Sequence, residues 1–237
     1  MNHRMNSLGQ PVGARLEGWT ACPRPPRDVM AGRYCRLEPL DPDRHAAGLH
    51  AANSEDRDGR VWTYLSYGPF NTLADYVAWM RRDCLGDDPL FHAVIERATG
   101  VATGVASYLR IVPAVGVIEV GHINYAPPLQ RSRAATEAMY LMMRRVFDEL
   151  GYRRYEWKCD ALNAGSRAAA ARLGFRFEGV FRQATLYKGR NRDTAWFAVT
   201  DGDWPALKAR FERWLDPANF DGDGGQRESL SGLALAD

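Results

Sequence analysis

The 237-residue sequence lacks several features that would assign it at once to a class of protein. No CxxC pair occurs, which argues against a zinc site or a disulfide framework and indicates reduced thiols. No run of about 18 apolar residues and no secretory signal is present, so we expect a cytoplasmic protein with no membrane partner. Because the cysteines form no CxxC pair, we also expect no metal. The four cysteines are widely spaced, at Cys22, Cys35, Cys84 and Cys159.

The sequence also lacks an excess of charge of either sign. Its 31 basic and 29 acidic residues give a net charge of +2, too little for the broad positive field that attracts nucleic acid, so any anion site must be local. Neither GxxxxGK[ST] nor a strand-linked GxGxxG occurs, which disfavours the common nucleotide-phosphate loops.

The composition that is present, 46% hydrophobic and 25% charged, is typical of a folded globular chain of one main domain. Residues 1–32 carry several prolines and arginines without periodic apolar spacing, so we predict an extended N-terminal arm. We place the domain at residues 33–216. Gly- and Asp-rich residues dominate the far end, which predicts a flexible tail at 217–237.

Within the domain the apolar period changes repeatedly between two and 3.6 residues. Strands come first, and then helices and strands alternate, which indicates a mixed α/β sheet with helices on both faces. We expect an antiparallel meander over 90–125, because turn residues separate its three strands. The predicted strands are 34–38, 90–96, 102–111, 115–125, 152–159, 175–181 and 194–200. The predicted helices begin at Asp41-Pro42, at Thr72, after Pro127-Pro128, at Asn163 and at Trp204.

The segment 118–150 carries the first indication of chemistry. It reads as a strand, a Pro-Pro break, a short basic loop and a helix. Unpaired amides and a partial positive charge at a helix N-terminus favour an anion such as phosphate, and Arg131 and Arg133 add charge there. The small residues Ala134 and Ala135 would let a phosphate group approach the backbone. Alone, this pattern also fits a solvated helix start, which is the more common reason for basic residues there.

Four short motifs, in order along the chain, strengthen the phosphate interpretation. The run Gln130–Ala135 resembles the Q/R-x-x-G-x-G/A loop of the GCN5-related N-acetyltransferases (GNAT). Asn163–Ser166, Leu173–Phe175 and Glu178-Gly179 resemble signatures of the branch that contains ribosomal-protein N-terminal acetyltransferases (RimJ/RimL-like). The resemblance covers roughly residues 33–200. It implies the GNAT acyl-CoA N-acyltransferase fold, in which a central strand splays from its neighbour, and acetyl-CoA as cosubstrate.

The resemblance also assigns residues to coenzyme A. The loop amides would cradle the diphosphate, and the backbone near the end of the preceding strand would pair with the pantetheine arm. Arg133 stands where the family has its first loop glycine, so it cannot easily adopt a positive φ. Its side chain is expected either to clasp a phosphate or to lie in solvent. The predicted cofactor-binding residues are Asn124, Tyr125, Gln130, Arg131, Ser132, Arg133, Ala134, Ala135, Thr136 and Asn163.

Transfer to an amine needs a base. Glu119 lies in an apolar strand, where burial would raise its pKa, and the resemblance also puts a base on this strand, so it is our first choice; a salt-bridged carboxylate is the alternative. By alternation His122 should face the other side of the strand unless a bulge intervenes. It is either a proton relay or a core histidine.

The departing thiolate needs an acid. Asn163 and Ser166 fit an ordinary capped helix start, whereas the family's matching Asn contacts the coenzyme arm and its matching Ser is a candidate acid. Many relatives have a tyrosine where this chain has Ala170. The acid role therefore passes to Ser166, Tyr125 or water.

The acceptor side is less defined. An aromatic cluster between the first two helices, Trp62, Tyr64, Tyr67 and Phe70, would either wall a cleft or pack in the core. The acidic residues Glu55, Asp56 and Asp58 would attract a cationic amine or lie in a solvated loop. The basic hairpin tip at 187–193 would touch substrate or only solvent.

These observations predict an N-acetyltransferase that moves acetyl from acetyl-CoA to a primary amine by direct attack in a ternary complex. The amine is a protein N-terminal α-amine or that of a small molecule. The alternative is a catalytically weak acyl-CoA-binding or sensing module. A homodimer is a further expectation, because such folds often pair through their C-terminal strands and the predicted helix at 204–215 offers apolar surface.

Overall fold

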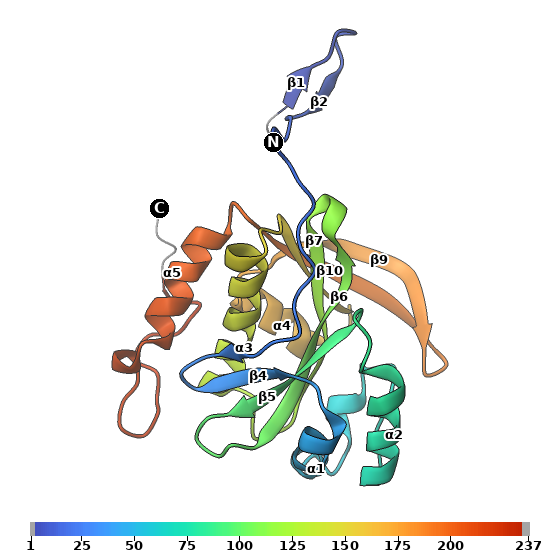
Figure 1. The fold of residues 1–237 in the computed structure, drawn as a ribbon, viewed down its shortest axis with the longest axis vertical. Helices are drawn as coiled ribbons and strands as arrows, with labels where there is room; N and C mark the ends of the chain where they lie inside the picture. The colour runs from blue at the N-terminus through green and yellow to red at the C-terminus, as the bar shows by residue number, and fades with distance from the viewer. Residues whose placement is uncertain (1–2, 234–237) are drawn as a thin grey trace.

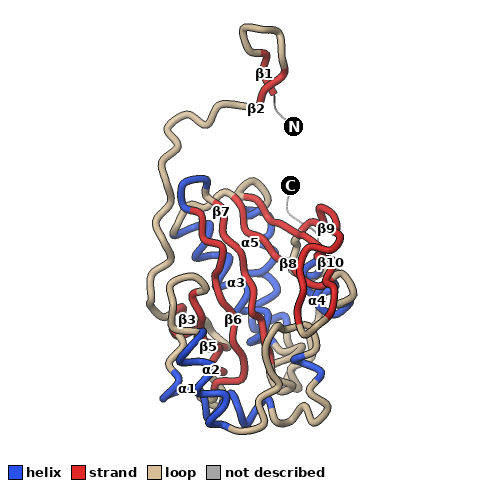
Figure 2. Tube along the Cα trace, turned by 90° about the vertical axis from the view of Figure 1, so that its right-hand side faces the viewer, coloured by secondary structure: helices blue, strands red, loops and turns tan. Residues whose placement is uncertain are grey.

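An eight-stranded mixed sheet organises the domain in the computed structural model, which describes residues 3–233 (Figures 1 and 2). Its strand order is β3-β4-β5-β6-β7-β8-β10-β9, and every neighbouring pair is antiparallel except β7 and β8, which are parallel. The strands are β3 (Met30–Ala31), β4 (Cys35–Pro39), β5 (Leu90–Glu96), β6 (Ala102–Val112), β7 (Val117–Tyr125), β8 (Arg154–Asp160), β9 (Arg176–Tyr187) and β10 (Arg190–Thr200). The predicted mixed sheet and its meander are confirmed.

Helices cover both faces of the sheet. One face packs against α3, α4 and α5 in the larger core cluster, and the other packs against α1 and α2 in a smaller aromatic-rich cluster. Side-chain caps define where four of these helices begin, namely Asp41, Thr72, Ser132 and Asn163. The helices are α1 (Pro42–Asn53), α2 (Leu73–Asp83), α3 (Arg133–Arg144, continued by a π-helical turn over Arg145–Glu149), α4 (Ala164–Arg172) and α5 (Trp204–Leu215).

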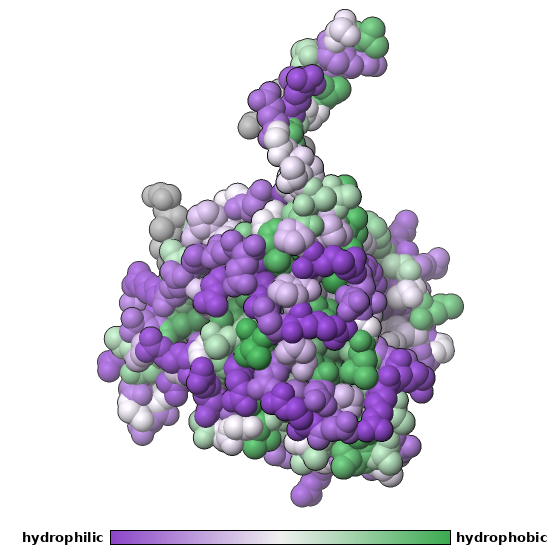
Figure 3. All heavy atoms as spheres, in the orientation of Figure 1, coloured by the Kyte–Doolittle hydropathy of each residue, from purple (hydrophilic) through white to green (hydrophobic). Residues whose placement is uncertain are grey.

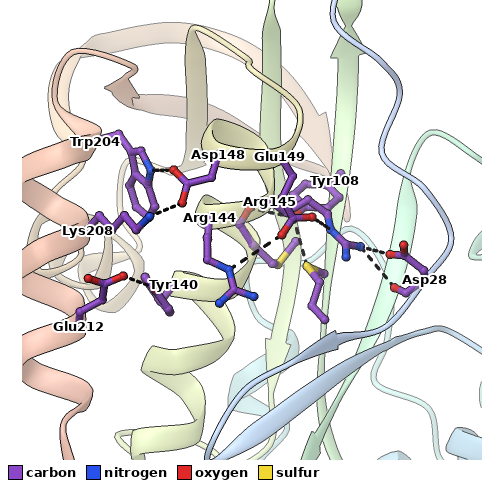
Figure 4. A network of polar contacts seen from close by, with 12 residues as sticks. Asp28, Tyr108, Tyr140, Arg144, Arg145, Asp148, Glu149, Trp204, Lys208 and Glu212 are labelled. Carbon is purple, nitrogen blue, oxygen red and sulfur yellow. Dashed lines mark hydrogen bonds and ion pairs between the residues drawn. The ribbon is translucent and has the colours of Figure 1, made fainter.

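The far end of α3 is fixed by a polar network to α5 and to the N-terminal arm (Figure 4). Asp148 accepts hydrogen bonds from Trp204 Nε1 and Lys208 Nζ of α5, both at 2.6 Å. The buried Arg145 pairs with Asp28 of the arm and, at 3.1 Å, with Glu149. These contacts hold the helix whose N-terminus faces the candidate site.

Residues 3–32 form an extended arm that contains short strands, which the sequence pattern did not reveal. A hairpin of β1 (His3–Met5) and β2 (Pro11–Gly13) stands clear of the body of the molecule (Figures 1 and 3). The later part of the arm lies against the domain, where Trp19 Nε1 donates to Ala114 O (3.0 Å) and Tyr152 Oη to Pro23 O (3.1 Å). Residues 1–2 of the predicted arm lie outside the described range.

The predicted flexible tail is instead packed along α5 as far as it is described. Leu230 and Leu233 are buried in the larger core, and Glu228 pairs with Arg213 of α5 at 2.7 Å. Isolated leucines among glycines and polar residues gave no periodic signal, which is why composition alone indicated mobility. Residues 234–237 lie outside the described range.

The last two strands are longer than predicted. β9 continues six residues beyond the expected end at 181, and β10 begins four residues before 194. Most of β9 is exposed, so its sequence lacks the alternation that marks a half-buried strand. The result is a long hairpin whose tip reaches back over the loop between α1 and α2.

Candidate active site

The sheet opens at its one parallel pair. β7 and β8 pair only over Val117–Val120 and Arg154–Trp157. Beyond that point β7 runs on to Tyr125 and β8 to Asp160 without pairing with each other. One edge of β7 therefore keeps backbone donors and acceptors that no strand uses, and the predicted splay of the central strands is present.

The turn after β7 presents several unpaired amides. The amides of Leu129 and Gln130 both donate to Ala126 O, and Arg131 then adopts a left-handed conformation with φ of 59°. Ser132 caps α3 by accepting from the amide of Ala135 at 3.0 Å. Within residues 3–233, the amides of Arg131, Arg133 and Ala134 have no acceptor. The turn predicted to bind an anion therefore presents free donors at a helix N-terminus, an arrangement that suits an anion.

The left-handed backbone conformation falls at Arg131 and not at Arg133, the residue that stands at the family's first loop glycine. Arg133 is the first residue of α3, so it has ordinary helical geometry although the family has glycine there. Its guanidinium is neither paired with a carboxylate of residues 3–233 nor free in solvent. It is held between the rings of Tyr34 and Phe220, 4.9 and 4.7 Å from their centroids. Phe220 belongs to the segment predicted as flexible, which explains why the sequence did not indicate this contact.

Two further residues that were predicted to bind the cofactor have defined hydrogen-bond partners. Gln130 Nε2 donates to Tyr125 O at 2.8 Å, so its side chain bridges the end of β7 and the turn. Thr136 is buried, and its hydroxyl accepts from Arg172 of α4 at 3.1 Å. Thr136 therefore connects the first turn of α3 with α4.

A bulge in β7 places Glu119 and His122 on the same face of the sheet, against the alternation that predicted opposite faces. Val105 pairs with Asn124 and Ser107 with Gly121, so the one residue between the β6 pair faces two residues of β7, and His122 has a φ of 50°. The side chain of His122 consequently reaches the aromatic cluster of α2, where its Nδ1 lies 3.3 Å from Tyr67 Oη. Burial, followed by the charges of Arg110 and Arg192, lowers the pKa of His122 to about 4.

Glu119 is buried and held by two cations. Its Oε1 accepts from Arg110 Nη1 at 2.6 Å, and its Oε2 lies 2.8 Å from Lys158 Nζ. Lys158 also pairs with Glu156 at 2.7 Å and lies over the ring of Trp196. The salt-bridged alternative for Glu119 is therefore present, at the point where β7 and β8 part. Sequence reasoning missed Lys158, whose only signal was a charge in a strand of buried residues.

The end of β7 holds two polar side chains without partners. Asn124 is only 2% exposed, and neither atom of its side-chain amide has a hydrogen-bond partner in the described part of the chain. The hydroxyl of Tyr125 is likewise buried and unpaired there, and burial raises the pKa of Tyr125 well above its usual value. A buried, unpaired amide is costly, so both groups fit an external partner lying along β7.

Asn163 and Ser166, the two residues predicted at the start of α4, both belong to its helix cap. Asn163 Oδ1 accepts from the amide of Ser166 at 3.0 Å, and Ser166 Oγ accepts from Trp157 Nε1 at 3.0 Å. Because the indole only donates to this hydroxyl, the proton of Ser166 remains available to another acceptor. Position 170 is a fully buried alanine, whose side chain has no hydroxyl.

Aromatic residues and a hairpin tip enclose the other side of the opening. Tyr67 stacks on Trp79 with ring centroids 4.3 Å apart and packs edge-on against Trp62. The hairpin tip contacts the same loop, because Lys188 Nζ donates to Trp62 O and Arg190 to Thr63 O, at 2.8 and 2.7 Å. The cluster therefore packs as core and also forms the wall beside His122.

The acidic residues of the same loop lie elsewhere. Asp56 and Asp58 line a separate cavity of about 300 Å³ together with His50 and Asn53, and Trp62 lies between this cavity and Tyr67. They are not neighbours of His122, so the prediction that they attract the amine to the opening finds no support in the geometry.

Within residues 3–233, no cluster of three His, Cys, Asp or Glu side chains is arranged to bind a metal. The same part of the chain contains no helix with the length and apolar character needed to cross a bilayer.

Comparisons with known proteins agree with this geometry. The family model described as "Acetyltransferase (GNAT) domain" matches residues 35–176. A GCN5-related N-acetyltransferase structure from Brucella melitensis is 50% identical, with a TM-score of 0.89 over 91% of this chain and 97% of that one. A GNAT-family structure from Chromobacterium violaceum ATCC 12472 is 41% identical, with a TM-score of 0.77 over 83% and 98% of the two chains.

A more distant structure shares the fold alone. The microcin C7 self-immunity acetyltransferase MccE, in complex with acetyl-CoA and AMP, is 20% identical, with a TM-score of 0.63 over 75% of this chain and 98% of that one. Among curated proteins, none matches the chain significantly.

Proposed function

This chain belongs to the GNAT acetyltransferase family, and we propose that it transfers acetyl from acetyl-CoA to a primary amine by direct attack within a ternary complex. One observation carries the proposal. The opening between β7 and β8 ends at a turn whose amides at Arg131, Arg133 and Ala134 have no acceptor in residues 3–233. A strand edge and an anion site in series match a pantetheine arm and its diphosphate.

Different residues of this region bind different parts of the cosubstrate. The amides of Arg131, Arg133 and Ala134 bind the diphosphate, with Ser132 fixing the turn and Ala135 keeping it open. The free edge of β7 and the unpaired amide of Asn124 bind the pantetheine amides from one side, and Asn163 of α4 approaches from the other. Acetyl-CoA supplies the thioester that the amine attacks.

Two residues on the same face of β7 are candidates for proton removal. The amine nitrogen forms a bond to the acetyl carbon, the carbon–sulfur bond breaks, and the nitrogen must lose a proton. Glu119 is the proposed base, acting directly or through water, because it lies where the strands part. His122 is neutral at pH 7 since its pKa is lowered to about 4, and its imidazole serves as relay beside Tyr67.

The thiolate takes its proton from Ser166 or Tyr125. Ser166 Oγ accepts from Trp157 Nε1, and its own proton can be donated to a sulfur, since the Cys159 thiol is a neighbouring hydrogen-bond partner. Tyr125 stays protonated at all ordinary pH values, because burial raises its pKa, and its hydroxyl is unpaired within the described residues. Ala170 provides no hydroxyl at the position where many relatives have tyrosine.

The acceptor is proposed to be a protein N-terminal α-amine or a small-molecule amine. The Asn163, Gly174-Phe175 and Glu178-Gly179 motifs support the branch of ribosomal-protein N-terminal acetyltransferases. The wall of Tyr67 and Trp62 is suited to apolar atoms beside the amine.

Thiol release from acetyl-CoA with a panel of amines and short peptides tests the proposal. Release that depends on an acceptor, with acetyl found on its amine, supports transferase activity. Tight binding of acetyl-CoA without release on any acceptor would favour the weak or sensing module, for which the alanine at position 170 is the observation in favour.

A homodimer is a separate proposal. The edge strand β9 exposes Phe177, Val180, Phe181 and Leu186, an apolar surface that a second copy would cover. Light scattering coupled to size exclusion should give twice the mass of the 26.6 kDa chain, and a monomer at micromolar concentration would refute it.

A further inference from the structure

Two arginines lie together between α3, α4 and α5, and neither is paired with a carboxylate of the described residues. Arg172 ends α4, its Nη1 donates to Thr136 Oγ1 at 3.1 Å, and its guanidinium lies 5.1 Å from the ring of Trp214. Arg210 of α5 has its Nε and Nη2 atoms buried and without a partner in residues 3–233. Neither arginine makes an ion pair in that range.

Such an arrangement is unfavourable without an anion. A buried cation loses its hydration, and two guanidinium groups near each other add repulsion. Burial and then the charge of Arg210 lower the pKa of Arg172, and burial lowers the pKa of Arg210. On the same helix, Lys208 and Arg213 each have a carboxylate, Asp148 and Glu228.

The local structure keeps the two groups in place rather than letting them turn to solvent. Trp214 and Thr136 hold the Arg172 guanidinium from two sides, which fixes its fork of donors. Gly174 has a φ of 94°, and a Cβ there would come within 2.9 Å of Arg210 Nη2. The glycine therefore leaves room for the Arg210 side chain beside α4.

The position of the pair relates it to the anion loop. Thr136 lies in the first turn of α3, four residues after the cap Ser132, which corresponds to about 6 Å along the helix. Coenzyme A carries a diphosphate and, a few ångströms away on its ribose, a separate phosphate. We propose that Arg172 and Arg210 bind this ribose 3′-phosphate while the loop amides bind the diphosphate. The inference rests on the proposed use of acetyl-CoA.

Binding of two cofactor forms tests the inference without any mutation. Calorimetry on the full chain should show that coenzyme A binds at least about tenfold more tightly than 3′-dephospho-coenzyme A, because only the former engages the arginines. Equal affinity for the two forms would overturn the 3′-phosphate assignment while leaving the proposed function intact. Failure to bind either form would instead overturn the proposed function.

Variants then assign the preference to the two residues. Arg172→Met and Arg210→Met should each weaken coenzyme A binding about tenfold and leave 3′-dephospho-coenzyme A unchanged. Arg213→Met on the same helix is the matched control and should retain the full preference, because its partner is Glu228 at the surface. If each variant weakens the binding of coenzyme A and of 3′-dephospho-coenzyme A by the same factor, the two arginines do not distinguish the 3′-phosphate and the proposal is wrong. Arg172→Lys, which keeps the charge, should recover part of the preference.

Discussion

Glu119 Oε2 and Lys158 Nζ lie 2.8 Å apart across the point at which β7 and β8 cease to pair. The contact joins the two strands just where the backbone ladder stops, so a side-chain ion pair continues the connection. It also fixes the carboxylate at the apex of the opening. The ion pair therefore connects the two strands at the opening and also positions the carboxylate that we propose as the base.

Glu119→Gln tests the chemical part of this role. The amide keeps the size of the side chain but cannot accept the amine proton, so we expect kcat to fall at least about tenfold and cofactor affinity to change little. Glu156→Gln is the matched control, because Glu156 shares Lys158 with Glu119 at nearly the same distance. Steady-state kinetics would contradict the base assignment if the two variants lost activity equally or if Glu119→Gln kept the wild-type rate.

His122→Asn tests whether the imidazole contributes to turnover as a neutral group. Burial lowers the pKa of His122 to about 4, so the imidazole is neutral throughout pH 5.5–8 and should give no limb near 6.5 in the profile of kcat. The variant should lower kcat without changing the shape of the profile in this range. A wild-type limb near pH 6.5 that disappears in the variant would show that the imidazole titrates normally.

Asn163 has two roles that a pair of variants can distinguish. Its side chain caps α4 through Ser166, so Asn163→Ala should lower the free energy of unfolding by about 1 kcal/mol, whereas Asn163→Ser preserves the cap. If Asn163 also contacts the coenzyme arm, both variants should weaken acetyl-CoA binding. Urea unfolding and calorimetry measure the two effects, and normal affinity in the serine variant would limit Asn163 to capping.

Much of the fold was accessible from local signals. Apolar periodicity and capping residues such as Thr72 and Asn163 located the helices, and β5 has the predicted bounds, Leu90–Glu96. The exceptions share a cause. In β9 and in the tail, structure depends on pairing with distant residues, so exposed or isolated apolar side chains carried no periodic pattern.

The candidate site was predictable only in part, for a similar reason. The turn between β7 and α3 is built from consecutive residues, so local signals indicated where α3 begins, whereas anion binding by this turn stays a prediction. The bulge that turns His122 toward Tyr67 depends on a register shift between β6 and β7, which no local pattern encodes. The ion pair of Glu119 with Lys158 and the contact of Arg133 with Phe220 join segments far apart in the chain.

Arg131 offers a test of backbone geometry in the anion loop. Its φ of 59° is costly for a residue with a Cβ, and glycine avoids this cost. Arg131→Gly should therefore be more stable than Arg131→Ala by about 1 kcal/mol, although both lack the guanidinium. Urea unfolding of the two variants isolates the backbone term, and equal stability would mean that the turn relaxes to a negative φ.

His92 gives a prediction for stability against pH. The side chain is fully buried in β5, and burial, together with the charge of Arg145, lowers its pKa to about 4. Above pH 6.5 neither the folded nor the unfolded state binds this proton, so the residue adds no pH dependence. As the pH falls from 6.5 to 4, the unfolded chain becomes protonated while the native residue does not. The native state should therefore lose up to about 3 kcal/mol through this residue, and the loss should level off below pH 4, where the native residue also takes a proton.

His92→Phe measures that contribution, because a phenyl ring fills similar space and does not titrate. The variant should show a smaller decrease in the free energy of unfolding between pH 6.5 and 4.5 than the wild type does. His122 has a similarly lowered pKa and accounts for a second part of the decrease, so His122→Asn should reduce the slope as well. Denaturant titrations at several pH values compare the slopes. An unchanged slope in His92→Phe would mean that His92 takes up its proton in the native state near pH 6.5, by opening the strand to water.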